Sequence, residues 1–221
     1  MRNGEELGFT IIELMVGIAL TLLIAAAATL LLGSSIGENR RVLLEARLTQ
    51  DLRSAADLVA RQTRRSGYWG TASTLGLWSQ GASALPNPYA ALTPDTGDSD
   101  TIALRYSQDA SENNTVDDNE QVGFRLRSGV LEAQLGDGNW QALTDSSTLV
   151  VTRFRVEPRV QTVALEPACA CGSAPCASPQ VQVRSVDIEI GARATSDASV
   201  LRTVRATVRL RNDHLSGGCN A

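Results

Sequence analysis

The sequence predicts an α+β protein in which one long N-terminal helix packs on a mainly antiparallel β-sheet. An uncharged apolar run extends from Leu14 to Leu32, and apolar residues three and four apart continue it over residues 34–65, which indicates a single helix. The rest of the chain contains short runs that alternate apolar and polar residues between glycine-containing turns. That pattern is typical of antiparallel strands with one buried face.

The apolar run is long enough to cross a membrane. Its nineteen residues would cover roughly 28 Å as a helix, about the hydrocarbon thickness of a bilayer. Glu13 stands at its start, where an ionised carboxylate costs at least about 2.5 kcal/mol and needs a partner or an interfacial position. A secretory signal peptide has a shorter apolar core. A simple signal anchor would explain the length of the run but would leave Glu13 without a role.

Beyond the apolar run, the helix is expected to bury one apolar face on the sheet. Gly33 and Gly37 each cost roughly 1 kcal/mol inside a helix, and Ser35 and Glu38 match a capping box, so a break is a weaker alternative. We expect one helix that ends near Ser66–Gly67, where glycine can take the left-handed conformation. The apolar face consists of Ile36, Leu44, Leu48, Leu52, Ala55, Ala56 and Val59.

A long surface loop and then six strands are predicted after the helix. The segment Ser79–Asp100 is rich in Gly, Pro, Ser and Asp, which indicates the loop. Ser128–Gly129 and Asp137–Gly138 supply hairpin turns. The predicted strands are Thr101–Ser107, Val122–Arg127, Val130–Leu135, Leu149–Glu157, Val181–Ile190 and Val200–Arg211.

The residues Gly8-Phe9-Thr10-Ile11-Ile12-Glu13-Leu14, preceded by a short leader, resemble the class III signal of type IV pilins and type II secretion pseudopilins. The resemblance implies that a membrane peptidase cleaves between Gly8 and Phe9 and methylates the new amino terminus. Glu13 becomes the fifth residue of the mature chain. In the filament it would face the terminal ammonium of a neighbouring subunit, a contact worth several kcal/mol where the dielectric constant is low.

A second region, Arg64-Arg65-Ser66-Gly67-Tyr68-Trp69-Gly70, is similar to the end of the helix in PilW-like minor type IV pilins. We expect Tyr68 and Trp69 to cover the helix end as core aromatics. The resemblance implies a minor pilin that helps to initiate assembly of type IV pili and is incorporated into them, with roles in twitching motility, adhesion or DNA uptake. It also implies a type IV pilin-like fold.

The resemblance further implies four segments, a location and a set of partners. The segments are a leader over residues 1–8, a transmembrane and filament-core half of the helix over 9–36, an amphipathic half over 37–66 and a β-rich periplasmic or extracellular domain over 67–221. The chain would sit in the inner membrane and then in the filament, at or near its tip. Its partners would be other minor pilins, the major pilin, the prepilin peptidase and the inner-membrane assembly platform.

Two alternative functions stay open at this stage. J-type pseudopilins of type II secretion share the signal and a large β-rich domain. A pilus-tip binding module would instead use the loops 79–100 and 109–120 to contact DNA, a surface or calcium.

Four cysteines near the end of the chain are candidates for disulfide bonds: Cys169, Cys171, Cys176 and Cys219. An even number of cysteines outside the cytoplasm favours two bridges, with three possible connectivities. A Cys171–Cys176 loop with Cys169 joined to Cys219 would pin the chain end. A four-thiolate zinc site is the alternative, although the cysteine spacing is not one of the usual zinc motifs.

The sequence predicts neither an enzyme nor a cofactor. His214 is the single histidine, so the chain alone cannot assemble a Ser-His-Asp or multi-histidine site, and no phosphate-binding glycine pattern occurs. Asp109, Asp117 and Asp118 are weak calcium candidates in an acidic segment that lacks the EF-hand frame. All 20 basic residues are Arg and are interspersed with acidic residues at a net charge of -4, which does not indicate nucleic-acid binding.

Overall fold

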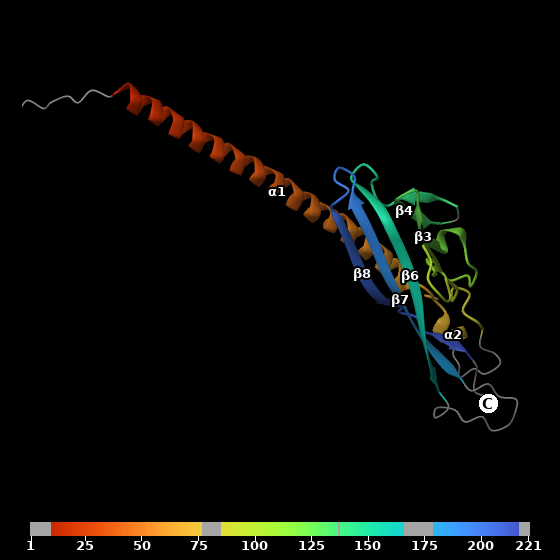
Figure 1. The fold of residues 1–221 in the computed structure, drawn as a ribbon. Helices are drawn as coiled ribbons and strands as arrows, with labels where there is room; N and C mark the ends of the chain where they lie inside the picture. Colours follow the sequence, from red (N-terminus) through yellow and green to blue (C-terminus); the bar gives the residue numbers. More distant parts are fainter. Residues whose placement is uncertain (1–9, 77–84, 137, 166–178, 217–221) are drawn as a thin grey trace, which may run out of the picture. The chain divides into compact units, whose positions relative to one another are not determined.

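The computed structural model describes residues 10–76, 85–136, 138–165 and 179–216. It contains one long helix and two antiparallel sheets (Figure 1), so the predicted α+β class is confirmed. By its internal contacts the chain divides into two compact units, Met1–Leu44 and Glu45–Ala221.

The first half of the long helix belongs to the first unit. Helix α1 runs without interruption over Ile11–Arg65 and passes through Gly33 and Gly37, so the predicted single helix is confirmed and the break suggested at Ser35 is absent. Its N-terminal stretch is long and apolar enough to cross a membrane. The large apolar side chains from Ile11 to Leu32 are exposed, so none of the described residues of this unit covers them.

The first sheet has the strand order β1-β2-β3-β4-β5, and all its pairs are antiparallel. Ser128 and Gly129 both have positive φ, 51° and 78°, and form the predicted two-residue turn between β3 and β4. Strands β1 and β5 were not predicted because each is too short to show an alternating pattern. The strands are β1 Leu92–Thr93, β2 Thr101–Arg105, β3 Gln121–Arg127, β4 Val130–Leu135 and β5 Trp140–Ala142.

The second sheet has the strand order β6-β7-β8, with β9 paired to β7. A single sheet was expected, and the structure instead divides the strands between two sheets that meet where Ser99 bridges to Val156. Strand β6 extends past its predicted end over residues 158–164, which are largely exposed, and β7 extends at its own end over residues 191–194, of which the buried ones are small. The strands are β6 Leu149–Ala164, β7 Gln180–Ala194, β8 Leu201–Arg209 and β9 His214–Ser216; the remaining elements are the short helix α2 Ala72–Leu75 and the 3-10 turn η2 Asp118–Glu120.

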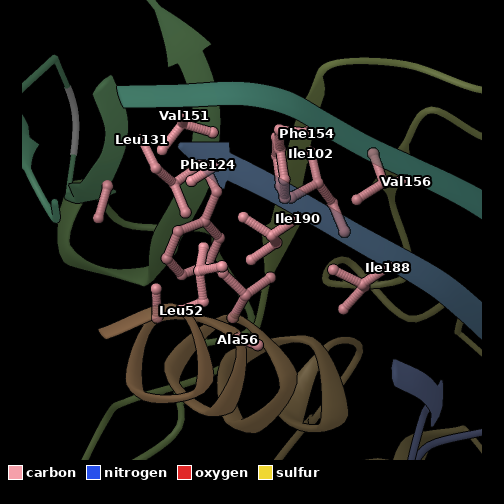
Figure 2. Packing of buried hydrophobic residues seen from close by; sticks show 14 of the residues in the cluster. Leu52, Ala56, Ile102, Phe124, Leu131, Val151, Phe154, Val156, Ile188 and Ile190 are labelled. Carbon is pink, nitrogen blue, oxygen red and sulfur yellow. The ribbon is translucent and has the colours of Figure 1, made fainter. Parts of the chain in front are cut away.

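One hydrophobic core joins the second half of α1 to both sheets. Figure 2 shows Leu52 and Ala56 of α1 with Phe124 of β3 and Ile188 and Ile190 of β7. Five residues of the predicted apolar face are buried, namely Leu48, Leu52, Ala55, Ala56 and Val59. Leu44 is only half-buried, and the side chain of Ile36 lies outside the described part of the chain. The predicted packing of the helix on strands is thus confirmed for this half.

The C-terminal end of α1 is held by groups from distant parts of the chain. The Arg211 N–H donates to the Arg64 carbonyl at 3.0 Å, and Asn212 Nδ2 donates to the Ser66 carbonyl at 3.1 Å. Asn87 Nδ2 donates to the Gly67 carbonyl at 2.8 Å. The last carbonyls of a helix lack partners inside the helix. The bond to Arg64 satisfies one of them, and the other two bonds fix the residues that follow the helix to the domain.

Gly67→Ala is expected to destabilise the domain more than Gly97→Ala. Both glycines have left-handed backbones, with φ of +75° and +71°, so each substitution costs about 1 kcal/mol in strain. A Cβ at position 67 would also lie 3.0 Å from Nη2 of the buried Arg184, whereas nothing lies within 4 Å at position 97. Urea denaturation of the two variants measures the difference, and equal losses would contradict the role given to Arg184.

Candidate functional site

The first turn of α1 fixes the position of Glu13. Thr10 precedes the helix; its carbonyl accepts from the Leu14 N–H at 3.1 Å, and its Oγ1 accepts from the Glu13 N–H at 3.3 Å. Thr10 is therefore the N-cap, and Glu13 occupies the third helical position, as in a capping box. Sequence reasoning noted this pattern only at Ser35 and Glu38, whereas the structure places the helix start at the first of the two occurrences.

Glu13 is the only charged residue in the first seven turns of the helix, since the next one is Glu38. The positive end of the helix dipole favours a carboxylate in the first turn. Its neighbours Ile12 and Leu14 are exposed by 75% and 59% of their area, so the carboxylate stands within an uncovered apolar surface. A partner that covers this surface must therefore also neutralise or hydrogen-bond one carboxylate.

The other two residues of the predicted signal, Gly8 and Phe9, lie outside the described residues. Their roles remain predictions. Cleavage after Gly8 would leave Phe9 and Thr10 ahead of the first helical residue, Ile11, so that the new amino terminus would be close in sequence to the helix start.

All four cysteines, Cys169, Cys171, Cys176 and Cys219, also lie outside the described residues. The strand ends that lead to them are nonetheless neighbours. Ala164 of β6 pairs with Gln180 of β7, and Gln180 pairs in turn with Ser216 of β9. The two chain segments that carry the cysteines, 166–178 and 217–221, are therefore flanked by adjacent strand ends of one sheet, which is compatible with any of the three disulfide connectivities.

A soluble domain that starts at Glu38 is expected to contain no free thiol after periplasmic expression. Closing a loop of about 50 residues that ends at Cys219 would stabilise it by roughly 4 kcal/mol through the lower entropy of the unfolded chain. Thiol titration in denaturant measures the number of thiols, and a parallel metal analysis measures zinc. Four reactive thiols, or one equivalent of zinc, would contradict the disulfide assignment.

Trp69 covers the helix end as expected, but Tyr68 does not. Trp69 is buried, and its Nε1 donates to Asn114 Oδ1 at 2.8 Å. Thr71 Oγ1 donates to the same oxygen at 2.6 Å, and the Gly70 N–H donates to Glu112 Oε2 at 3.0 Å. Tyr68 is 50% exposed, so its predicted core position is wrong. Its backbone carbonyl accepts from the Ser107 N–H at 2.9 Å, two residues after β2.

The segment after the helix is thus joined to the acidic segment 109–120, and Tyr89 completes this link. The Tyr89 hydroxyl is 2.9 Å from Glu112 Oε1 and 3.4 Å from Glu120 Oε1. Burial and the adjacent Glu112 raise the pKa of Tyr89, so the hydroxyl keeps its one proton and donates it to the nearer carboxylate, Glu112. Burial alone would raise the pKa of Glu112, but hydrogen bonds from Ser107 and the Gly70 N–H outweigh it and lower that pKa.

Tyr89 and Glu120 were both missed at the sequence level. Tyr89 lies in the segment predicted as a surface loop, yet its side chain is fully buried. Glu120 is also fully buried, and its two oxygens accept from the Gln108 and Asp117 N–H groups at 2.8 and 2.9 Å. The only sequence signal for the buried contact between Tyr89 and Glu120 was a single tyrosine among Pro, Gly and Ser residues.

The weak calcium candidates lie in the same segment. Asn113 links two of them, because its N–H is 3.4 Å from Asp109 Oδ2 and its Nδ2 is 2.9 Å from Asp117 Oδ2. Asp118 begins η2. Within the part of the chain that the structure describes, no group of three or more His, Cys, Asp or Glu side chains is arranged to hold a metal ion. The calcium hypothesis gains no support here and stays a prediction.

An apolar, capped N-terminal helix with one carboxylate in its first turn, continuing into an amphipathic half packed on antiparallel sheets, defines a pilin-like protein. A family model described as Prepilin peptidase-dependent protein B (PpdB) matches residues 41–210, well over half of the chain. The chain belongs to this family and is a prepilin-peptidase-dependent pilin-like protein. The match begins after the apolar run, so it is independent of the signal around Glu13. No curated protein and no solved structure matches the chain.

Proposed function

We propose that the chain is a minor pilin of the PilW type, which helps to initiate assembly of type IV pili and is incorporated into them. The observation that carries this proposal is the single carboxylate, Glu13, in the capped first turn of a long, exposed apolar helix. A membrane anchor has no need of this carboxylate, whereas a filament core in which helices pack side by side supplies a partner for it.

The proposed partner is the N-methylated amino terminus of a neighbouring subunit. Cleavage between Gly8 and Phe9 would create an ammonium group, and the helix dipole at the start of α1 favours Glu13 in its charged form. In the low dielectric of packed apolar helices, leaving one charge of such a pair alone costs several kcal/mol. The contact would therefore set the register between neighbouring subunits.

The second half of α1 and the two sheets have a different task. Residues 45–65 are fixed to the domain by the core and by the bonds at the helix end, so the domain would be displayed by the filament as one body with this half of the helix. We place the chain in the inner membrane before assembly, with the domain in the periplasm, and afterwards at or near the filament tip. The proposed partners are the prepilin peptidase, the assembly platform, the major pilin and other minor pilins, and the proposed role is not catalytic.

Mass spectrometry of the protein from membranes is expected to show a first residue of N-methylated Phe9. The reason is that small Gly8 and the residues after it match the recognition pattern of the prepilin peptidase. The matched control is the same chain expressed without a prepilin peptidase, which should begin at Met1. A Met1 terminus in both cases, or cleavage within the run Ala25–Ala28, would contradict the pilin assignment.

The subunits that co-purify with the chain from sheared filaments decide which machine it serves. Recovery with a major pilin and other minor pilins is expected. Recovery only with components of a type II secretion system would assign it to the J-type pseudopilins instead and would leave the fold and the Glu13 contact unchanged.

A further inference from the structure

The outer face of the three strands β6, β7 and β8 is a grid of charged side chains. The strand registers place Arg155, Glu189 and Arg205 in one row across the sheet and Glu157, Asp187 and Thr207 in the next. Residues that alternate with these point to the other side and belong to the core, including Phe154, Val156, Ile188 and Ile190. One face of this sheet is therefore committed to the core, and the other is polar.

Ion pairs connect residues of different rows as well as residues on neighbouring strands. Glu189 lies between two arginines, with Oε1 3.1 Å from Arg153 Nε and Oε2 3.0 Å from Arg205 Nε. Asp187 pairs with Arg159 and accepts from Thr207 Oγ1 at 2.6 Å. The hydrogen bonds from Thr207 and Arg159 lower the pKa of Asp187, so this carboxylate of the central strand keeps its negative charge.

At the ion pairs of the β7 carboxylates, the two signs of charge are not equally accessible, whereas Arg155 is less exposed than its partner Asp98. The Arg205 side chain is 77% exposed, whereas its partner Glu189 is 19% exposed. Arg159 is 61% exposed and its partner Asp187 is 33% exposed. The carboxylates are recessed along β7 and the guanidinium groups stand above them on β6 and β8. A molecule that approaches β7 therefore meets arginine first. The Nε–H groups of Arg159 and Arg205 already contact carboxylates, which leaves the N–H groups on Nη1 and Nη2 as donors.

The grid also encloses a hollow of about 460 Å³ lined by Arg155, Arg159, Asp187, Glu189 and Arg205, among others. We propose that this outer face binds an extended acidic segment of a neighbouring filament subunit, whose carboxylates contact the exposed arginines. The inference rests on the proposed function for the identity of the neighbour. Arginine pairs carboxylates through two parallel hydrogen bonds, which gives such a contact direction as well as charge.

A protein segment suits this face better than a nucleic acid. The carboxylates of Glu157, Asp187 and Glu189 lie between the arginines, so a continuous row of phosphates would stand over negative charge as well as positive charge. An extended peptide places side chains on one side at every second residue, about 6.6 Å apart. The same spacing separates the outward residues Arg153, Arg155, Glu157 and Arg159 of β6, so a peptide can place acidic side chains opposite the arginines and a neutral or basic one opposite Glu157.

Site-specific photo-crosslinking in cells that assemble filaments tests the inference on the full chain. A photoreactive residue replaces Thr203, which lies on the outer face in the row of Arg153 and Gly191. The control replaces Gln141 of β5, which is exposed on the other sheet. The expected result is an adduct with another filament subunit at Thr203, mapped by mass spectrometry to a segment with several carboxylates, and at least about fivefold less adduct at Gln141.

Charge reversal of exposed arginines is the second part of the crosslinking experiment. Arg159→Glu with Arg205→Glu is expected to lower the Thr203 adduct at least about tenfold, because both exposed cations become repulsive. Arg53→Glu with Arg127→Glu, at exposed arginines outside the grid, should leave it unchanged. The milder Arg159→Gln with Arg205→Gln should give an intermediate loss. Thermal unfolding of each variant shows whether a lost adduct reflects misfolding. If the charge-reversed variant is misfolded, the adduct yield of the folded Arg159→Gln with Arg205→Gln variant tests the role of the arginines instead.

The possible outcomes separate this inference from the proposed function. An adduct with nucleic acid or lipid, an adduct that ignores charge reversal, or no adduct while the chain is present in filaments would overturn the docking surface. An acidic segment of a secretion-system component at Thr203, with loss on charge reversal, would support the surface and overturn the pilus assignment. A chain that is absent from filaments and forms no adduct would overturn both.

Discussion

Glu13→Ala is expected to leave membrane insertion and cleavage intact and to reduce incorporation into filaments on the order of a hundredfold. Removing one member of a charge pair in a low-dielectric surrounding costs about 3 kcal/mol or more, because the remaining ammonium of the neighbour stays buried without a partner. Insertion should not suffer, since an apolar run without a carboxylate enters the bilayer more readily. Quantitative immunoblotting of sheared filaments and of membranes measures the two effects separately.

Glu38→Ala is the matched control for this experiment. It removes the next carboxylate along α1, beyond the apolar run, where the side chain remains exposed. Wild-type incorporation is expected for it. If Glu13→Ala were incorporated as well as Glu38→Ala at equal protein levels, Glu13 would have no role in subunit packing and the assembly proposal would lose its main support.

Leu52→Ala is expected to lower the free energy of unfolding of the domain by about 2–5 kcal/mol. Leu52 is fully buried in the core that joins α1 to both sheets, so its truncation leaves a cavity that neither sheet can close by itself. For a domain of ordinary stability this is a large share of the total. Urea denaturation of the soluble domain that starts at Glu38 provides the measurement.

Leu201→Ala provides the comparison, because this leucine is 54% exposed at the start of β8. Its replacement should change the free energy of unfolding by no more than about 0.5 kcal/mol. Similar losses for the two leucines would show that the second half of α1 contributes no more to the core than a surface position does.

Local patterns were sufficient for the long helix and for the longer strands. The spacing of Leu48, Leu52 and Val59 predicts the buried face of α1 correctly, because helical periodicity is a property of neighbouring residues. The turn at Ser128–Gly129 follows in the same way from a glycine, which readily accepts positive φ, between two strand-like runs. The strand β4 is predicted to the residue, since its apolar and polar residues alternate directly after this turn.

Tertiary contacts determined the elements that carry no such pattern. Short strands such as β1 and β5 form because a neighbouring strand supplies their hydrogen bonds. A sequence of two or three residues does not indicate which strand will pair with it. The same is true of Tyr89, whose burial depends on Glu112 and Glu120 from a segment more than twenty residues away. The loop-like composition around Tyr89 therefore gave no indication that its side chain is buried.

By itself, the sequence determined the class of this protein: the apolar run, Glu13 at its start and the amphipathic continuation each depend on residues near one another in the chain. The tertiary structure alone decided how the strands divide between two sheets, which groups hold the end of α1, and that the arginines of β6 and β8 stand above the carboxylates of β7. These features join residues far apart in sequence, and their free energy arises only once the backbone has brought them within contact distance.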